Sequence, residues 1–548
     1  MNLKLLLKNL YKNPRLILFT LISLYLFLEL LNITVPGLYD DEALPACGAI
    51  QIINRSIPIL MPAVKLFNIH FPLVIPPYHT ALESYILLPF FWLFGIKVVV
   101  LRSVPIIMGA ITLIFVYLFL KDFFDKKVGL LAVFLLVINN IFLLETKLGL
   151  NSASMLHFAA IGALLSLWRW YRGKGEKYFY LGIFLLGLGI SIRVWFTWFV
   201  DGVFLLGLIF YKNIVNKIKK NILRYTLFGT VIFCLGIFLF IFYNITSNLA
   251  TIKHIIEHFS DTRNGINNFE YLGNLISRLR NFSLWLNGSW SLLEQGGWYN
   301  RTPMKDIFTN PVSPGLFLWS FIYLTLAAFF KKSHYSCRRV LFILLLFIVI
   351  LLQSPLTLST LGGPHLFILY PLIQIIIALA FIDIIRKFKT NKIMFCFIAA
   401  VFFIFIFKEC NNTFNNNYLY FNKTGGTGNN SNSIYAVSKY LEDQQISEPI
   451  IMDWGIYHNL IFLSQGKAAP KTFGYIQGGH HKEIFVAELK NLLKRPNTYI
   501  FHAVEFSNRQ DVYAIFIEVC RELGKSIIKE KIFYQKDGKP VFVIYSVS

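Results

Sequence analysis

Eleven apolar stretches set the strongest limit on how this 548-residue chain can fold. Each is roughly 15–24 residues long, and about 20 apolar residues in a helix are enough to cross a bilayer. Charged residues make up only 15% of the chain, whereas soluble proteins carry about 25%. The sequence therefore predicts a mainly α, polytopic membrane protein with about 11 transmembrane helices. The apolar stretches are 16–34, 100–120, 128–144, 152–168, 178–192, 196–211, 225–243, 312–330, 340–356, 365–385 and 393–407.

The net charge of +23 is concentrated in the amino-terminal segment and in five short connections between these stretches. These six basic connections are 1–15, 121–127, 169–177, 212–224, 331–339 and 386–392. Together they hold 24 Lys and Arg residues against three acids, and they are every second connection along the chain. Basic residues accumulate in cytoplasmic loops. The charge therefore predicts a multi-pass protein of the cell membrane, with a cytoplasmic amino terminus and an external carboxyl terminus, and no nucleic-acid partner. The first stretch lacks a small-residue cleavage site, so it is predicted to be an anchor.

The external connections are unequal in length. Two are long, at 35–99 and 244–311. The first contains helix-like pieces at 43–54 and 80–94, and we expect the second piece to lie along the outer membrane face. Residues 409–432 are rich in Asn, Gly and Thr and are predicted to be a mobile linker that ends the membrane domain of residues 1–408. Of the six cysteines, Cys410 and Cys520 are both expected outside and could pair.

Residues 433–548 are predicted to form a small external α/β domain. Apolar runs at 449–452, 498–503 and 541–545 have the composition of strands, and helical patterns near 433–443, 481–494 and 509–523 alternate with them. The domain has no glycine-rich phosphate loop, since Gly474 and the pair at 478–479 fit neither nucleotide-binding pattern. We expect it to handle an acceptor or to act as a scaffold.

Three consecutive acids, Asp40, Asp41 and Glu42, directly follow the first apolar stretch. Adjacent carboxylates repel one another, and no basic residue lies within ten positions on either side. A solvated turn would explain such a cluster. The alternative is a site in which one carboxylate acts as a general base or the acids hold a divalent cation, the one cofactor that the sequence leaves open.

Other ionisable residues lie at the outer ends of the predicted spans. A charge placed there costs free energy unless it is paired or used. Glu145 and Lys147 could form an ion pair with each other, or Lys147 could reach the lipid headgroups. An arginine at such a position is also a candidate phosphate ligand. Besides Glu145 and Lys147, the ionisable residues at the outer ends of predicted spans are Arg102, Arg193 and His365.

This collection of acids, cations and a histidine suits a reaction whose donor is a lipid-linked phosphate. The cations would stabilise the departing phosphate, and a carboxylate would deprotonate the acceptor. A transporter or flippase is an alternative, although such proteins usually have repeated halves and charges at the membrane midplane. A lipid-linked oligosaccharide polymerase or ligase and a non-catalytic scaffold that presents 433–548 also stay open.

Five short segments add a resemblance. They are the acidic loop at 37–43, a Pro-Pro element at 75–78 that leads to Phe-Gly at 94–95, an Arg-Ser-Val-Pro run at 102–105, a Gly-Leu-rich run at 185–193 and a His-to-Pro element at 365–371. In these segments the chain resembles the GT-C superfamily of polytopic glycosyltransferases. The similarity is to its family 39-like group, which includes dolichyl-phosphate-mannose protein mannosyltransferases and bacterial lipid A aminoarabinose transferases.

The resemblance implies an activity. A hexosyl or pentosyl group would pass from a polyprenyl-phosphate donor to a lipid, glycan or protein acceptor at the external membrane face, with inversion at the anomeric carbon. Asp41 would be the base, with Asp40 a rival by one position. Residues near the donor phosphate would be Arg102, Lys147, Arg193 and His365.

The chain departs from the family pattern at two places. Many members begin the Pro-Pro element with His, where this chain has Ile75 and carries His79 further along. Many members have Asp in the second external loop, where this chain has Asn151, so Glu145 would have to supply any acid there. Either departure could mean a different acceptor.

Reporter fusions test the predicted orientation. Fusions after Lys127 and Lys220 should report a cytoplasmic position and a fusion after Gly428 an external one, because the basic loops stay on the cytoplasmic side. A cytoplasmic signal after Gly428 would contradict the predicted parity of spans and would separate the last domain from the acidic loop.

Overall fold

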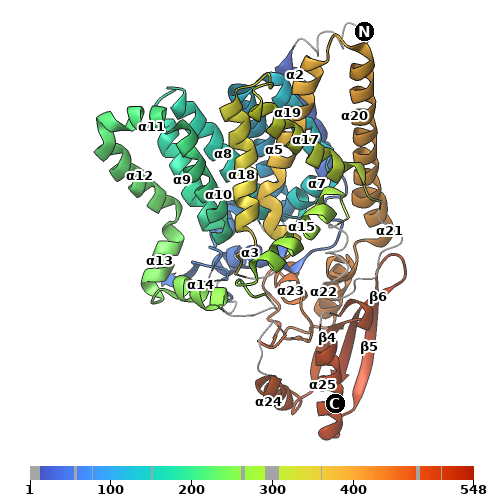
Figure 1. Ribbon diagram of the computed structural model, residues 1–548. Coiled ribbons are helices and arrows are strands. Elements are labelled where there is room, and N and C mark those ends of the chain that lie inside the picture. Colours follow the sequence, from blue (N-terminus) through green and yellow to red (C-terminus); the bar gives the residue numbers. More distant parts are fainter. Residues whose placement is uncertain are drawn as a thin grey trace.

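The computed structural model describes residues 13–54, 59–76, 78–149, 152–260, 266–289, 308–358, 361–476, 482–507 and 509–547. Its helices gather in one bundle, and a smaller domain with a four-stranded sheet lies against one end of the bundle (Figure 1). The mainly α fold with a small carboxyl-terminal sheet domain agrees with the sequence prediction.

All eleven predicted apolar stretches are helical. By length and composition, five of the described helices could cross a membrane alone, or seven if each of two bent pairs counts as one span. The chain is therefore a multi-pass membrane protein. The helices that correspond to the eleven apolar stretches are α2 (Pro14–Leu30), α5 (Val98–Phe123), α6 (Lys126–Val137) with α7 (Asn140–Leu148), α8 (Ala153–Tyr171), α9 (Lys177–Ile192), α10 (Thr197–Gly207), α12 (Ile222–Gly236) with α13 (Phe238–Thr246), α17 (Val312–Phe329), α18 (Cys337–Gln353), α19 (Tyr370–Lys387) and α20 (Lys392–Thr413).

The stretch 128–144 is bent, by 69° between α6 and α7. Asn139 starts α7 by accepting a hydrogen bond from the Phe142 N–H at 2.9 Å. Two side chains of α20 satisfy polar groups at the break: Glu409 accepts from Asn139 Nδ2 at 2.6 Å, and the Thr413 hydroxyl donates to the Ile138 carbonyl at 2.6 Å. Polar residues of a distant helix thus stabilise a bend that an apolar sequence pattern does not reveal.

The first long external segment contains both predicted helices, α3 (Asp40–Ile53) and α4 (Leu82–Phe94). Between them is a hairpin of β1 (Ala63–Leu66) and β2 (Ile69–Pro72), which the sequence analysis missed. The last residues of α4 are strongly exposed, with Trp92 at 79%. An apolar surface of this kind is expected of a helix that lies against lipid. The second long segment contributes α14 (Ala250–Ser260) and α15 (Tyr271–Leu286).

The carboxyl-terminal sheet has the order β3-β4-β6-β5. Strand β3 (Ile450–Ile451) runs parallel to β4 (Asn497–His502), and β6 (Pro540–Val547) is antiparallel to both β4 and β5 (Ile527–Tyr534). The predicted strands correspond to β3, β4 and β6. The predicted helices correspond to α22 (Ser433–Asp443), α24 (Lys482–Leu492) and α25 (Gln510–Glu522).

Two elements of this region were not predicted. Strand β5 carries Lys529, Glu530 and Lys531 on an exposed edge, so its composition does not resemble that of a buried strand. Helix α23 (Tyr457–Leu463) is short and packs on α3 (Figure 1). The cysteines Cys410 and Cys520 are both free, because Cys520 is buried in the sheet domain and Cys410 is exposed on α20.

Residues 409–432 are not an open linker, and here the structure corrects the sequence prediction. Helix α20 continues through a π-helical turn, Phe414–Tyr420, into α21 (Phe421–Thr424). Its asparagines are buried: Asn412 accepts from Asn140 Nδ2 at 3.3 Å, and Asn417 donates to the Asn140 carbonyl at 2.8 Å. Amide side chains that pair with one another can be buried. A composition typical of a mobile segment therefore belongs here to a packed polar helix.

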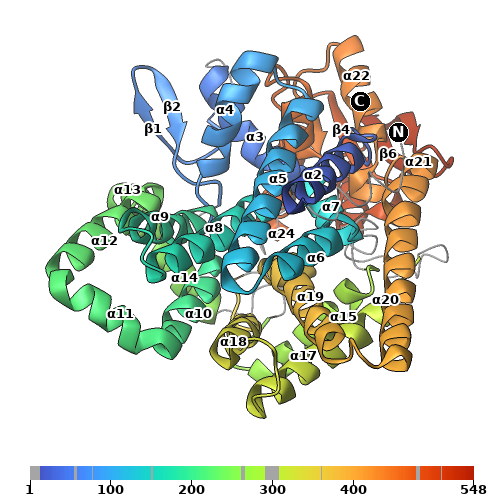
Figure 2. The same cartoon turned by 90° about the horizontal axis from the view of Figure 1, so that it is seen from above.

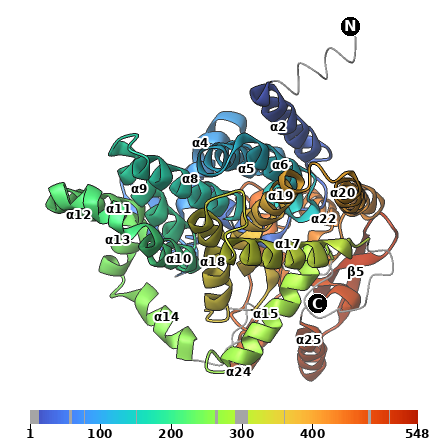
Figure 3. The same ribbon diagram turned by 45° about the horizontal axis from the view of Figure 1, so that its top comes forward.

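Helices α11 (Tyr211–Ile218) and α12 form one outer edge of the bundle (Figures 2 and 3). Helix α20 lies at the opposite edge and is only partly covered by other helices. Helix α3 lies at the end of the bundle that faces the sheet domain, whereas α11 lies toward the other end (Figure 1).

Candidate active site

The three acids of the first external loop occupy the first turn of α3. The unpaired N–H groups at a helix amino terminus carry partial positive charge, so this position stabilises carboxylates. Successive helix positions point about 100° apart, and the three side chains consequently meet three different environments. This arrangement explains how three adjacent acids can be buried in the protein although no basic residue is close to them in the sequence.

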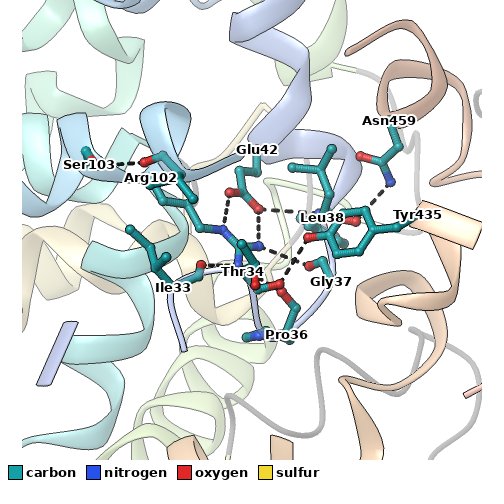
Figure 4. A network of polar contacts seen from close by, with 12 residues as sticks. Ile33, Thr34, Pro36, Gly37, Leu38, Glu42, Arg102, Ser103, Tyr435 and Asn459 are labelled. Carbon is teal, nitrogen blue, oxygen red and sulfur yellow. Dashed lines mark hydrogen bonds and ion pairs between the residues drawn. The ribbon is translucent and has the colours of Figure 1, made fainter. Parts of the chain in front are cut away.

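Glu42 forms a buried ion pair with Arg102 of α5 (Figure 4). Arg102 Nε and Nη2 donate to the two carboxylate oxygens at 2.6 and 2.9 Å. The remaining N–H groups of Arg102 donate to the carbonyls of Ile33 at 2.8 Å, Pro36 at 2.8 Å and Gly37 at 3.1 Å. Arg102 therefore ties the loop before α3 and the first turn of α3 to the membrane bundle.

This network corrects the roles predicted for two residues. Arg102 was expected near a donor phosphate, but every N–H of its guanidinium is engaged within the protein. Glu42 was grouped with the catalytic acids, but its charge is compensated by Arg102 and its side chain is only 2% exposed. The contacts of both residues thus link the amino terminus of α3 to α5.

Asp40 is bound from the opposite side by the carboxyl-terminal domain. His458 of α23 donates its backbone N–H to Asp40 Oδ1 at 2.9 Å, and its Nδ1 lies 2.7 Å from Asp40 Oδ2. Burial opposes the charged form of His458, but the carboxylates of Asp40 and Asp41 outweigh it and raise the pKa of this imidazole. Asp40 therefore has a hydrogen-bonding partner that lies 418 residues away in the sequence.

Asp41 is the acid that stays available. In the part of the chain that the structure describes, its carboxylate makes no hydrogen bond or ion pair, and it is partly exposed, so a reactant can reach it. Desolvation and the neighbouring Asp40 raise the pKa of Asp41 to about 6, against the attraction of Arg193 and His458. A carboxylate with this pKa is ionised at neutral pH and is a stronger base than an ordinary aspartate.

Arg193 lies between α9 and α10, where the backbone is extended (φ −150°, ψ 131°). Its side chain is only 7% exposed, and its Nε has no hydrogen-bond partner among the described residues. The guanidinium lies 5.1 Å from the ring of Trp195, against which His365 packs at 4.5 Å. Asp41 is within electrostatic range of the same guanidinium. The structure thus brings Asp41, Arg193 and His365 to one region.

His79 belongs to the same region. It is 1% exposed, and neither ring nitrogen has a hydrogen-bond partner among the described residues. Burial and the nearby Arg193 hold its pKa well below the ordinary value, so the ring is neutral. Next to it, Thr80 donates its hydroxyl to the Ser191 carbonyl at 2.7 Å and fixes this loop to the end of α9. A neutral imidazole can hydrogen-bond to a ligand but adds no positive charge.

Lys147 is engaged elsewhere. Its Nζ donates to the Leu31 carbonyl at 3.1 Å and lies 5.3 Å from the ring of Tyr418. Glu145, on the same helix α7, is 2% exposed. Lys147 therefore has partners of its own, and Asn151 lies outside the described residues.

Two residues of the site were missed. Glu83 of α4 is buried, accepts a hydrogen bond from Ser152 Oγ at 2.6 Å and lies within electrostatic range of Arg193. It is the only charged residue in the apolar stretch 80–94, which is the signal that could have identified it. His458 gave no such signal, because its role depends on how a distant domain docks.

The divalent cation that the sequence leaves open stays a prediction. Over the described ranges, no group of three or more His, Cys, Asp or Glu side chains is arranged to hold a metal. Glu42 is bound to Arg102 and Asp40 to His458, whereas Asp41 has no hydrogen-bond or ion-pair partner among the described residues.

Comparisons with known proteins agree with this site. A family model described as dolichyl-phosphate-mannose-protein mannosyltransferase matches residues 78–241. The matched segment contains His79, Glu83, Arg102 and Arg193 and begins after α3. No curated protein sequence matches the chain.

Solved structures match over nearly the whole chain. ArnT from Cupriavidus metallidurans, solved with undecaprenyl phosphate, is 11% identical with a TM-score of 0.57 over 96% of this chain and 97% of its own. The oligosaccharyltransferase of Archaeoglobus fulgidus in its apo form is 12% identical, with a TM-score of 0.55 over 92% of this chain and 71% of its own. AglB of the same organism, with an inhibitory peptide and a dolichol-phosphate, is 13% identical, with a TM-score of 0.56 over 94% and 72%.

At these identities the likeness establishes the fold. The chain has the GT-C fold of integral-membrane glycosyltransferases, which confirms the resemblance drawn from its short motifs. The match to ArnT covers 96% of this chain, so it includes both the bundle and the sheet domain.

Exchange of His458 for Gln tests the contact with Asp40. Because the pKa of His458 is raised in the folded protein, its charge stabilises that state below the ordinary value of about 6.5, and this contribution is lost as the pH rises through the raised pKa. The difference in thermal unfolding midpoint between wild type and His458→Gln should be largest below about pH 6.5 and should shrink toward alkaline pH. The exposed His334→Gln is the control. A pH-independent difference at His458 would contradict the ion pair.

Proposed function

We propose that the chain is a glycosyltransferase that moves a sugar from a polyprenyl-phosphate donor to a hydroxyl acceptor at the external face of the membrane. The fold and the family match support the class of enzyme. The observation that carries the proposal is the pairing of the three acids: Glu42 is paired with Arg102 and Asp40 with His458, and Asp41 alone is unpaired within the described chain and close to Arg193.

A general base must reach the acceptor hydroxyl in its ionised form. Asp41 meets this requirement because it is partly exposed and its pKa of about 6 leaves it ionised at neutral pH. Asp40 meets it less well, because both of its oxygens accept hydrogen bonds from His458. The geometry therefore favours Asp41 over Asp40 as the base.

Arg193 is the candidate for the departing phosphate. An arginine that is nearly buried without a complete set of partners is costly unless an anion reaches it. Trp195 holds the guanidinium on one side, which leaves its N–H groups directed along a plane that suits a phosphate. His79 and His365 lie beside it and could donate further hydrogen bonds.

In the proposed step, the acceptor oxygen forms a bond to the anomeric carbon while the bond from that carbon to the phosphate oxygen breaks. The hydroxyl proton passes to Asp41. The polyprenyl phosphate leaves with one additional negative charge, which Arg193 compensates. Direct displacement of this kind inverts the configuration at the anomeric carbon.

The related structures support a lipid-linked donor. ArnT was solved with undecaprenyl phosphate and AglB with a dolichol-phosphate and a peptide. The alternative, a lipid-linked oligosaccharide ligase, is less well supported because this chain spans 97% of ArnT but 71% of the archaeal oligosaccharyltransferase. We therefore favour transfer to a lipid, glycan or protein hydroxyl, by an enzyme of the cell membrane whose sheet domain faces outside.

The exchange Asp41→Asn should reduce sugar transfer by about 100- to 10,000-fold, because it preserves shape but removes the base. Asp40→Asn is the matched control and should cost much less. Wild-type transfer should rise with pH through about 6, where Asp41 loses its proton. Transfer is measured in proteoliposomes with a panel of radiolabelled polyprenyl-phosphate sugars. A larger loss at Asp40, or near-full activity of Asp41→Asn, would overturn the assignment.

The exchange Arg193→Ala should weaken binding of the lipid-phosphate donor by about 10- to 150-fold, the range expected for one charge-assisted contact. Arg193→Lys should recover only part of this loss, because an ammonium lacks the planar fork of a guanidinium. Donor retention in proteoliposomes gives the measurement, with the exposed Arg280→Ala as control. Unchanged retention in Arg193→Ala would remove this residue from the site.

A further inference from the structure

A second polar cleft lies at the other end of the bundle from the candidate active site. Its volume is about 560 Å³, and it opens between the end of α8, helix α11 and the start of α18. Figure 1 shows α11 toward one end of the molecule and α3 with the sheet domain toward the other. The loops that border the cleft are three of the six basic connections and are therefore predicted to be cytoplasmic.

Four cationic side chains line this cleft. They are Arg172, Lys217, Arg338 and Arg339. None of its lining residues is acidic. Like charges that share a cleft repel one another, and Arg172 lies within electrostatic range of Arg339. An anion in the cleft would relieve this repulsion.

The nearby acids are engaged with other partners, including Asp383 of α19, which accepts hydrogen bonds from Tyr323, Ser333 and the His334 N–H and does not line the cleft. The basic connections contain three acids in all. Each is bound to an arginine outside the cleft: Asp122 to Arg169 at 3.3 Å, Asp125 to Arg386 at 2.6 Å and Glu176 to Arg224 at 3.1 Å. The side chains of Arg172, Lys217 and Arg338 make no hydrogen bond or ion pair over the described ranges. The unpaired positive charges of Arg172, Lys217 and Arg338 thus lie together in the cleft.

The cleft has a fixed aromatic wall. Trp168, Tyr171 and Phe210 contribute rings to it. Arg339 donates to the Phe123 carbonyl at 2.8 Å and lies 5.3 Å from the Trp168 ring, so this guanidinium is held in place. An anchored arginine beside three unpaired cations is a suitable receptor for a phosphate group.

Apolar side chains continue outward from this wall. Leu205 of α10 is 54% exposed, Leu208 is 63% exposed and Val215 of α11 is 53% exposed. Helix α10 leads into α11, which together with α12 forms one outer edge of the bundle (Figures 2 and 3). A soluble anion would use the cations alone, whereas a lipid would also cover this apolar edge with its acyl chains.

We propose that the cleft binds the phosphate head group of an anionic phospholipid of the inner leaflet, with the acyl chains along α10 and α11. The surface of that leaflet is enriched in anionic lipids, and basic pockets between helix ends bind such head groups. The site is separate from the proposed sugar-transfer centre and does not depend on it.

The test compares lipid binding by the purified full chain and by two triple variants. The cleft variant replaces Arg172, Lys217 and Arg338 by Gln and keeps the anchored Arg339. The matched control replaces Lys121, Lys332 and Lys389 by Gln. It removes the same amount of charge from the six basic connections but leaves the cleft unchanged. Native mass spectrometry counts the phosphatidylglycerol or phosphatidylcholine molecules retained from mixed vesicles, and inorganic phosphate is added as a competitor.

We expect wild type and the control to retain one phosphatidylglycerol tightly, and the cleft variant to bind it at least about tenfold more weakly. A double variant, Arg172→Lys with Arg338→Lys, should keep most of the binding and shows whether loss in the triple variant follows from charge. Equal loss in both triple variants would overturn the proposal in favour of general attraction to the basic face. Displacement of the lipid by millimolar inorganic phosphate would also overturn it, because the cleft would then be a site for a soluble anion.

Discussion

The buried ion pair between Glu42 and Arg102 holds the candidate site together. Arg102 comes from a membrane helix and Glu42 from the first turn of α3, and the same guanidinium holds three carbonyls of the connecting loop. Loss of one partner of such a pair typically costs about 3–5 kcal/mol, because a buried charge is left without compensation. The complete pair adds little stability compared with apolar packing, so its value here lies in fixing the orientation of the α3 amino terminus.

The carboxyl-terminal domain completes this positioning from the other side. Asn459 donates to the Leu38 carbonyl at 3.0 Å, Tyr435 donates to the Thr34 carbonyl at 3.1 Å, and His458 binds Asp40 (Figure 4 shows the first two). The domain shares its apolar core with the bundle, since Ile500 of β4 and Leu460 of α23 belong to the same buried cluster as the membrane helices. It is therefore part of the structure that holds the acidic loop and not a separate attachment.

These two sets of contacts give the three acids different surroundings. Glu42 is paired with Arg102 of the bundle, and Asp40 is bound by His458 of the carboxyl-terminal domain. Asp41 lies between them with its pKa raised to about 6. The cluster thus has two acids with partners inside the protein and one acid near Arg193, which is our candidate for the base.

The amino-acid sequence alone determined the class of fold. Apolar length and loop charge act locally and do not depend on which helices touch, so the helical stretches, the α3 and α4 helices and most elements of the sheet domain could be predicted. The acids and Arg193 were also identified, because unpaired charges in an apolar chain are conspicuous. Only the tertiary structure decided which charges pair. Glu42 and Arg102 are 60 residues apart and Asp40 and His458 are 418 apart, and the buried asparagines of 409–432 have the composition of a flexible linker. Such pairings are set by how distant elements pack, which no local pattern records.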